Sequence, residues 1–200
     1  MKIPITIILL LNFGVSNSQN FIEGIIYCAK DRAEEKLRFV VGNELLKTNF
    51  KFEESKTIIE IHNPEKGLER ISLAEFKKSE HPAIQFWINY KISDENLELT
   101  ELSVPFNLNC TTPWNSKDTQ EILEPYLKVL RNKTKIDLKK ALEIGNKNGL
   151  NEIYFWEIDY EKKKLIWTLK SKLKNNQSKV IKINSKNGKV MSEFIEIPID

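Results

Sequence analysis

Apolar and polar residues follow two different periods along this chain. Between residues 28 and 46, apolar residues recur every three to four positions, which is the period of one face of a helix. In two later stretches, residues 83–92 and 95–106, apolar and polar residues alternate, as they do in half-buried strands. The pattern predicts an α+β fold in which helices pack on antiparallel sheets.

Shorter elements are predicted between these stretches. The segments 48–54 and 56–62 alternate, and the polar residues between them suit a hairpin. A turn at 63–67 leads to Ser72, which can start a short helix with Glu75 in a capping box. The first half is therefore expected to run helix, two strands, short helix, two strands.

The second half predicts two helices followed by paired strands. Residues 117–132 are amphipathic, but Pro125 requires either a kink or a helix that starts afresh at Glu124. A second helix is expected from a cap at Asp137 to Gly149. A helix that lies across a three-stranded antiparallel sheet is the smallest arrangement that buries both apolar faces.

Residues 179–191 are predicted to form the last hairpin, and its first role is structural. Gly188 supplies the positive φ that a tight turn requires. Ile181 and Ile183 are expected to point inward, near Trp167, because strand residues two apart share a face. The residues on either side of Ile181 point to the other face and are expected to be less buried.

The N-terminus has the layout of a secretory signal peptide. Lys2 precedes an apolar run from Ile3 to Leu11, and Ser16 and Ser18 occupy the −3 and −1 positions of a cleavage site. Residues 1–18 are therefore predicted to be removed when the chain is exported, to the periplasm or out of the cell. A retained membrane anchor is the alternative, although the run is too short to span a bilayer.

Export bears on the two cysteines, Cys28 and Cys110. A disulfide between them is predicted, because an exported chain meets an oxidising compartment. Two buried free thiols are the alternative. A bridge that closes a loop of about 80 residues would contribute about 4 kcal/mol by restricting the unfolded chain.

Charge divides the chain into two parts. Residues 19–115 carry 12 Lys/Arg and 16 Asp/Glu, whereas residues 116–200 carry 18 and 12. An acidic first part and a basic second part indicate two structural units, 19–115 and 116–200. The composition, with 40% hydrophobic and 30% charged residues, is typical of a globular protein.

The second unit resembles the PepSY domain over about residues 134–195. That family shows a helix with small residues, a strand that carries Trp, and a final hairpin with Gly in its turn. The matching residues here are Ala141, Gly149, Trp167, Ile183, Asn184, Gly188 and Val190. Asn184, Asn187 and Gly145 depart from the residue types that the family uses most. The resemblance implies an exported, non-catalytic module that restrains peptidases or acts in the cell envelope.

Residues suited to catalysis or to metal binding do not gather in the sequence. His62 and His81 are the two histidines, and they lack a compact metal-ligand spacing. The sequence also lacks the motifs of a serine nucleophile, a phosphate-binding loop and a dinucleotide site. We therefore expect no catalytic residue, no metal and no cofactor.

Ten lysines and no acidic residue occur between Lys162 and Lys189. Lys170 and Lys172 share a strand face, and with Lys182 and Lys189 they form a candidate binding face for anionic polymers or lipid headgroups. Nucleic acid is disfavoured by the export signal and by the lack of arginine in this stretch. The alternative is a solvated face whose charges protect an edge strand.

These features predict an exported binding or inhibitory module without enzymatic activity. Its partner is expected to be a protein or a component of the cell envelope, bound through a sheet face or an edge strand. The alternatives are a secreted enzyme of an unrecognised type, and an envelope or lipid-surface protein that uses the lysine-rich face. The sequence does not indicate an oligomeric state.

Overall fold

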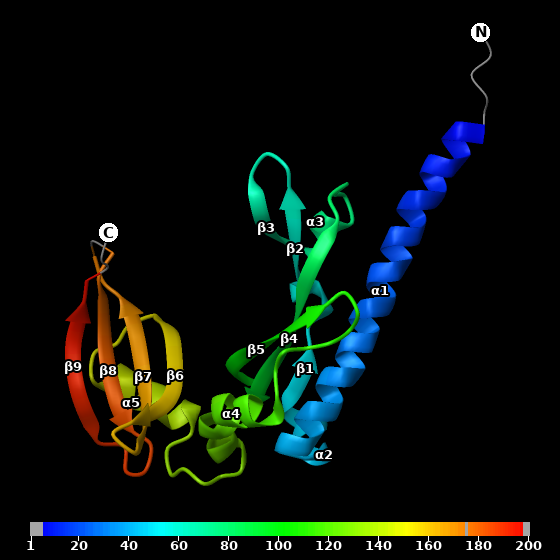
Figure 1. Cartoon of the computed structure of the whole chain (residues 1–200). Helices are drawn as coiled ribbons and strands as arrows, with labels where there is room; N and C mark the ends of the chain where they lie inside the picture. Colours follow the sequence, from blue (N-terminus) through cyan, green and yellow to red (C-terminus); the bar gives the residue numbers. More distant parts are fainter. Residues whose placement is uncertain (1–5, 175, 198–200) are drawn as a thin grey trace. The chain divides into compact units, whose positions relative to one another are not determined.

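The computed structural model describes residues 6–174 and 176–197, and the chain divides into two compact units (Figure 1). It contains helices and two antiparallel sheets, so the predicted α+β class is confirmed. The first unit contains the chain up to Leu46, Lys51–Tyr90 and Leu102–Ser116; the second contains Lys47–Phe50, Lys91–Glu101 and the chain from Lys117 onward. The sequence-based division near residue 115 had placed the segments 47–50 and 91–101 in the first unit.

A long helix opens the described chain. Helix α1 spans Thr6–Val41, so it begins well before the helix predicted from residue 28. Gly42, with a φ of +90°, separates it from α2, Asn43–Asn49. Lys2 of the predicted signal peptide lies outside the described residues. In the part of the chain that the structure describes, no helix has the length and apolar character needed to cross a membrane.

Five strands of the described chain form the first sheet. They are β1 (Phe50–Phe52), β2 (Ile58–Asn63), β3 (Gly67–Ser72), β4 (Ala83–Asp94) and β5 (Leu97–Asn107). Their order is β1-β4-β2-β3, and β5 pairs with β4. The predicted hairpin between the segments 48–54 and 56–62 is therefore wrong. The 3₁₀ turn η1, Glu54–Lys56, separates β1 from β2, which forms its hairpin with β3 instead.

A predicted helix cap and the predicted disulfide are both found in the first unit. The short helix α3, Leu73–Phe76, begins at the predicted capping box, in which Ser72 Oγ accepts a hydrogen bond from the Glu75 N–H. The predicted disulfide is present: the Cα atoms of Cys28 and Cys110 are 6.2 Å apart, and the bridge ties α1 to the segment after β5. The two cysteines are 82 residues apart in the sequence.

The second unit is built on a four-stranded sheet, as far as the chain is described. Its elements are α4 (Ser116–Leu130), α5 (Leu138–Lys147), β6 (Ile153–Glu161), β7 (Lys164–Lys172), β8 (Ser178–Asn184) and β9 (Val190–Glu196). The order is β6-β7-β8-β9, one strand more than the three-stranded sheet that was expected. Helix α4 continues through Pro125, so no new helix starts at Glu124.

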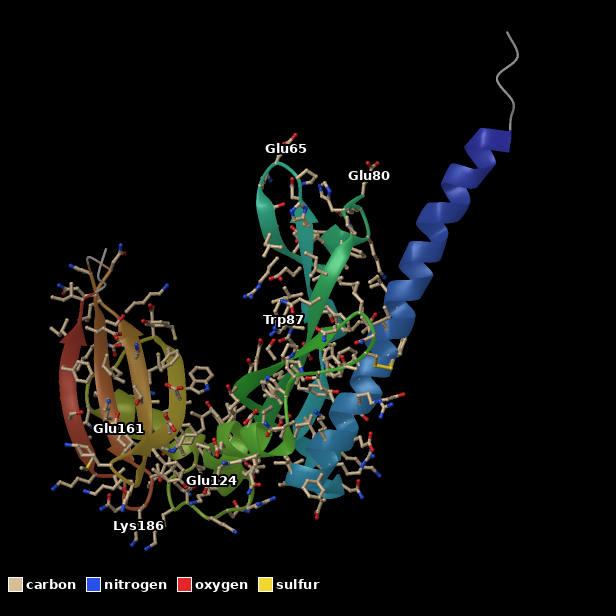
Figure 2. All side chains as sticks on the ribbon, viewed as in Figure 1. Glu65, Glu80, Trp87, Glu124, Glu161 and Lys186 are labelled. Atoms are coloured by element: carbon tan, nitrogen blue, oxygen red, sulfur yellow. A yellow bond between two sulfur atoms is a disulfide. The ribbon has the colours of Figure 1, made fainter. Side chains whose placement is uncertain are left out.

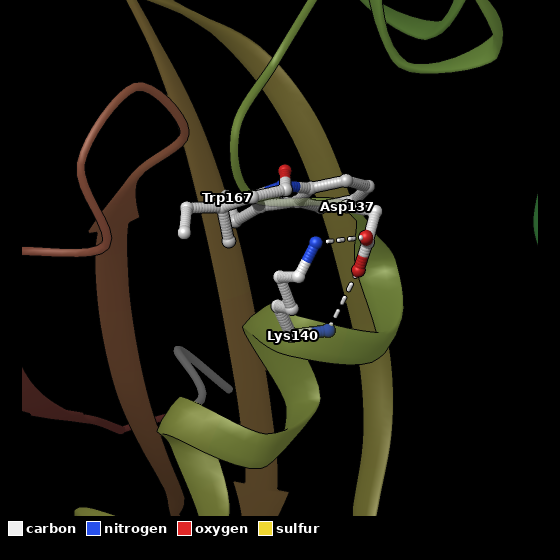
Figure 3. Close-up of polar contacts among 4 residues, drawn as sticks. Asp137, Lys140 and Trp167 are labelled. Carbon is white, nitrogen blue, oxygen red and sulfur yellow. Dashed lines mark hydrogen bonds and ion pairs between the residues drawn. The ribbon is translucent and has the colours of Figure 1, made fainter. Parts of the chain in front are cut away.

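Helix α5 covers one face of this sheet. Its predicted cap is confirmed, because Asp137 Oδ1 accepts a 2.8 Å hydrogen bond from the backbone N–H of Lys140 (Figure 3). A Cβ atom added to Gly145 would lie 2.7 Å from Leu169 Cδ1 in β7. The helix therefore lies so close to the sheet that glycine, rather than alanine, fits at this position.

The core of the second unit agrees with the predicted hairpin. Trp167, Ile181 and Ile183 are all fully buried, and Trp167 lies opposite Ile183 across the β7–β8 pair. The expectation that the other face would be less buried is wrong for Val180, which is 1% exposed. Its position in an interior strand explains this, because long side chains of the neighbouring strands, such as Phe194 of β9, cover it.

Candidate functional site

The face of the second sheet that α5 leaves open carries a groove of about 230 Å³. Side chains of a strand alternate between its two faces, so the residues of a strand that line this groove stand two positions apart. Ile166 and Val180 form its apolar floor and are 4% and 1% exposed. The partly exposed rings of Phe155 and Phe194 also line it, from β6 and β9. We call this feature the open-face groove.

Two of the predicted binding-face lysines lie in the open-face groove, and both have a carboxylate partner. Lys170 Nζ lies 2.6 Å from Glu196 Oε2, and its ammonium group is 5.1 Å from the centre of the Phe155 ring. Lys182 forms an ion pair with Glu161, a residue labelled in Figure 2. The positive charge of both lysines is therefore balanced on this face.

The other two lysines lie elsewhere. Lys172 is exposed, with its ammonium group 5.6 Å from the centre of the Tyr154 ring. Lys189 belongs to the turn between β8 and β9 and does not line the groove. The four predicted lysines therefore do not form one continuous basic stripe.

The groove is also lined by acidic side chains that were not among the predicted site residues, and they determine its net charge. Glu157 and Asp159 of β6 line it and are exposed, and neither forms an ion pair with a cation among the described residues. Counted with Glu161 and Glu196, four carboxylates face two ammonium groups. The open-face groove is therefore acidic, with an apolar floor beneath the charges.

The two residues that were predicted to be structural hold the framework behind the groove. Gly188 has a φ of +74°, and an added Cβ would lie 3.1 Å from Ile144 and 3.2 Å from Ile136. The Trp167 indole Nε1 donates a 2.9 Å hydrogen bond to the carbonyl oxygen of Ile136. The Trp167 hydrogen bond ties β7 to the segment that leads into α5. The close packing at Gly188 places the β8–β9 turn against the same segment.

The indole of Trp156 holds strand β6 in place. Trp156 Nε1 donates a 2.8 Å hydrogen bond to the carbonyl oxygen of Glu98, in the β4–β5 segment that belongs to this unit. Tyr126 of α4 is half-buried, and this burial raises the pKa of its hydroxyl, an effect to which the charges of Glu157 and Asp159 in β6 add. The edge strand that carries Glu157 and Asp159 is thus held in place along its inner face.

Groups suited to metal binding do not gather in the described part of the chain, where no three His, Cys, Asp or Glu side chains are placed to hold an ion. His62 lies in β2 and is exposed, whereas His81 lies between α3 and β4 and is half-buried.

Comparisons of the chain with protein-family models, with curated proteins and with solved structures found no match. A function for this chain therefore has to rest on its own residues.

Proposed function

We propose that this chain is an exported, non-enzymatic binding protein, and that its second unit holds an extended segment of a partner protein in the open-face groove. The observation that carries the proposal is the pair of carboxylates, Glu157 and Asp159, that stand without a cation partner among the described residues beside an apolar floor. A partner that brings positive charge and an apolar side chain to this face satisfies both features.

The spacing of the two carboxylates favours an extended polypeptide as the occupant. Glu157 and Asp159 are two residues apart on one strand face, which places them about 7 Å apart. An extended segment repeats its side chains on one face at the same interval. Two basic residues at positions i and i+2 of the partner can therefore each meet one carboxylate.

The apolar part of the groove adds to this complementarity. Ile166 and Val180 lie at its floor, and Phe155 and Phe194 are 37% and 43% exposed at its sides. An apolar side chain of the partner that covers these surfaces removes them from water, which stabilises the complex by about 25 cal/mol for each Å² buried. The rim charges contribute less, about 0.2–1 kcal/mol for each exposed ion pair.

Two further observations support export and the class of partner. The disulfide between Cys28 and Cys110 is of a kind that persists in oxidising compartments, and the residues Lys2 to Val15 have the composition of a signal peptide. The resemblance to the PepSY domain supports a peptidase as the partner. A module that occupies an extended segment of a peptidase would restrain its activity without doing chemistry itself.

Selection from a library of random peptides tests this function. The disulfide-bonded chain is immobilised, and the library is counter-selected on a Glu157→Gln/Asp159→Asn variant. We expect the selected peptides to carry Lys or Arg two positions apart next to a large apolar residue. Peptides without such a pattern, or peptides that bind the variant equally well, would contradict the proposal.

A further inference from the structure

Six lysines from three separate segments surround a second cavity of the second unit, with a volume of about 590 Å³. They are Lys128 of α4, Lys133 and Lys135 of the α4–α5 loop, Lys163 and Lys164 at the β6–β7 turn, and Lys186 of the β8–β9 turn. No acidic side chain is among the described residues that line the cavity. We call this feature the lysine basin.

The positive charge of the lysine basin is almost wholly unbalanced. Lys128 Nζ has a carboxylate 3.2 Å away, that of Glu124. The other five ammonium groups form no ion pair with the described residues, and the nearby Glu161 is already paired with Lys182. An anion that enters the basin therefore meets several cations at once and relieves their mutual repulsion.

Backbone hydrogen bonds hold the three segments together. The N–H of Ile136 donates a 3.0 Å hydrogen bond to the carbonyl oxygen of Ser185, and the N–H of Ser185 donates one of the same length to Leu165. The α4–α5 loop is thus tied to the β8–β9 turn, and that turn to β7. Because these bonds fix the backbone of the walls before a ligand arrives, binding has to order only the lysine side chains.

The turn between β6 and β7 places its lysines in an unfavourable backbone conformation. Lys162 and Lys163 have φ values of +48° and +65°, so both are left-handed. Such two-residue turns favour Asn and Gly, which adopt this conformation readily. The chain thus keeps positive charge at a position where turn geometry alone favours other residues. Lys186 extends outward from the same end of the sheet (Figure 2).

We propose that the lysine basin binds a compact anion that carries several phosphate or sulfate groups. Lysine ammonium groups act as point charges that suit the clustered oxygens of such groups. Thr134, Asn184 and Ser185, which also line the basin, offer neutral hydrogen-bonding groups beside them. The basin uses other residues than the open-face groove, so the two proposals stand or fall separately.

The lining residues favour a compact anion over a single strand of nucleic acid. Recognition of unpaired bases uses free aromatic faces and arginine, and the lining residues include no arginine. The aromatic ring among them, Tyr160, already contacts the Lys128 ammonium group 4.9 Å from its centre, and its hydroxyl donates to Glu124. A recessed site of this volume also fits a compact group better than a long polymer.

Calorimetric titration with inositol hexakisphosphate tests the site on the disulfide-bonded chain. The basin variant is Lys133→Gln/Lys135→Gln/Lys186→Gln. The control, Lys139→Gln/Lys147→Gln/Lys174→Gln, removes the same charge from exposed lysines of the same unit that do not line the basin. We expect at least tenfold weaker binding for the basin variant and less than twofold for the control. Equal weakening in both variants, or no binding by the parent, would overturn the proposal.

Two further titrations identify the source of the anion. Tripolyphosphate and a sulfated disaccharide stand for soluble ligands, and vesicles with a phosphorylated inositol headgroup stand for a lipid. If one of these ligands binds the parent protein and the basin variant loses that binding, the result supports the site and identifies the source of the anion. A single-stranded oligonucleotide is tested in the same way. If it binds more tightly than all of these ligands and depends on the basin lysines, the proposal of a compact anion is wrong and the ligand is a nucleic acid.

Discussion

The indole Nε1 of Trp167 donates a 2.9 Å hydrogen bond to the backbone carbonyl of Ile136. This contact links β7, the second strand of the sheet, to the segment that precedes the Asp137 cap of helix α5. Trp167 is fully buried, so its indole N–H has no access to water as a replacement partner. The same segment carries Lys135 of the lysine basin, and the same sheet carries the open-face groove on its other side.

Replacement of this indole should be costly. Trp167→Phe keeps an aromatic ring in the core but leaves the Ile136 carbonyl without its donor and opens a small cavity, so we expect a loss of about 3 kcal/mol in the free energy of unfolding. Urea denaturation measures this loss. Trp156→Phe is the matched control, because Trp156 also donates to a backbone carbonyl but is half-buried, and should cost about 1 kcal/mol. Equal stability of Trp167→Phe and the parent protein would show that the contact is dispensable.

Substitutions at Gly188 and Gly67 separate the cost of crowding an added Cβ from the cost of a positive φ. Both have a positive φ, of +74° and +83°, but only an added Cβ at Gly188 would meet neighbours, the side chains of Ile144 and Ile136. Gly67→Ala should therefore cost about 1 kcal/mol for its backbone conformation alone. Gly188→Ala should cost about 2 kcal/mol, and Gly188→Val up to about 3 kcal/mol, because crowding is added. A smaller loss for Gly188→Ala than for Gly67→Ala in the same denaturation experiment would contradict this order.

The β6–β7 turn should become more stable when its second lysine is replaced. Lys163→Gly removes a side chain from a residue with a φ of +65° and should raise the free energy of unfolding by about 1 kcal/mol. Lys163→Gln separates the cost of the backbone conformation from the cost of charge repulsion, because it removes the charge but keeps a side chain at the same φ. If Lys163→Gln stabilises the protein as much as Lys163→Gly does, repulsion in the lysine basin, rather than the turn, is the main cost.

Stability should fall at alkaline pH because of Tyr90. Burial raises the pKa of its hydroxyl well above the ordinary value of 10.0, and the charges of Glu34 and Asp31 add to the effect. The unfolded chain loses this proton near pH 10 while the folded chain keeps it, so the stabilisation is complete below that pH. Above about pH 10 the free energy of unfolding should fall by up to about 1.4 kcal/mol per pH unit from this residue.

Denaturation curves at a series of pH values between 9 and 11.5 measure this loss. Tyr90→Phe should flatten the alkaline fall, whereas Tyr27→Phe, at an exposed position, should keep the behaviour of the parent protein. An unchanged slope in Tyr90→Phe would mean that other groups cause the alkaline loss.

Local signals in the sequence were enough to predict several elements. The capping box of Ser72 and Glu75, the Asp137 cap of α5, and the hairpin turn at Gly188 depend on residues within a few positions of one another. Strand pairing depends on distant residues, and there the prediction failed. The sequence does not predict strand β3, Gly67–Ser72, because none of its residues is buried and it lacks the apolar alternation of a half-buried strand.

The candidate sites were harder to predict for the same reason. The run from Lys162 to Lys189 contains no acid. Pairing of its strands with β6 and β9, however, brings Glu161 onto Lys182 and Glu196 onto Lys170, and both acids lie outside the run. The alternation of acids along β6 was the available signal for the groove. The lysine basin gathers three loops that lie far apart in the sequence, so a linear count of lysines could not reveal it.

The affinity of a peptide for the open-face groove tests the central claim most directly. A peptide selected on the parent chain is titrated into three proteins: the parent, the Glu157→Gln/Asp159→Asn variant, and a Glu143→Gln/Glu152→Gln control. The control removes the same charge from exposed positions of the same unit outside the groove. Loss of two exposed ion pairs, about 1.4 kcal/mol in all, predicts roughly tenfold weaker binding for the groove variant and less than twofold for the control. Equal affinities of the groove variant and the parent would contradict the claim that this face binds the partner.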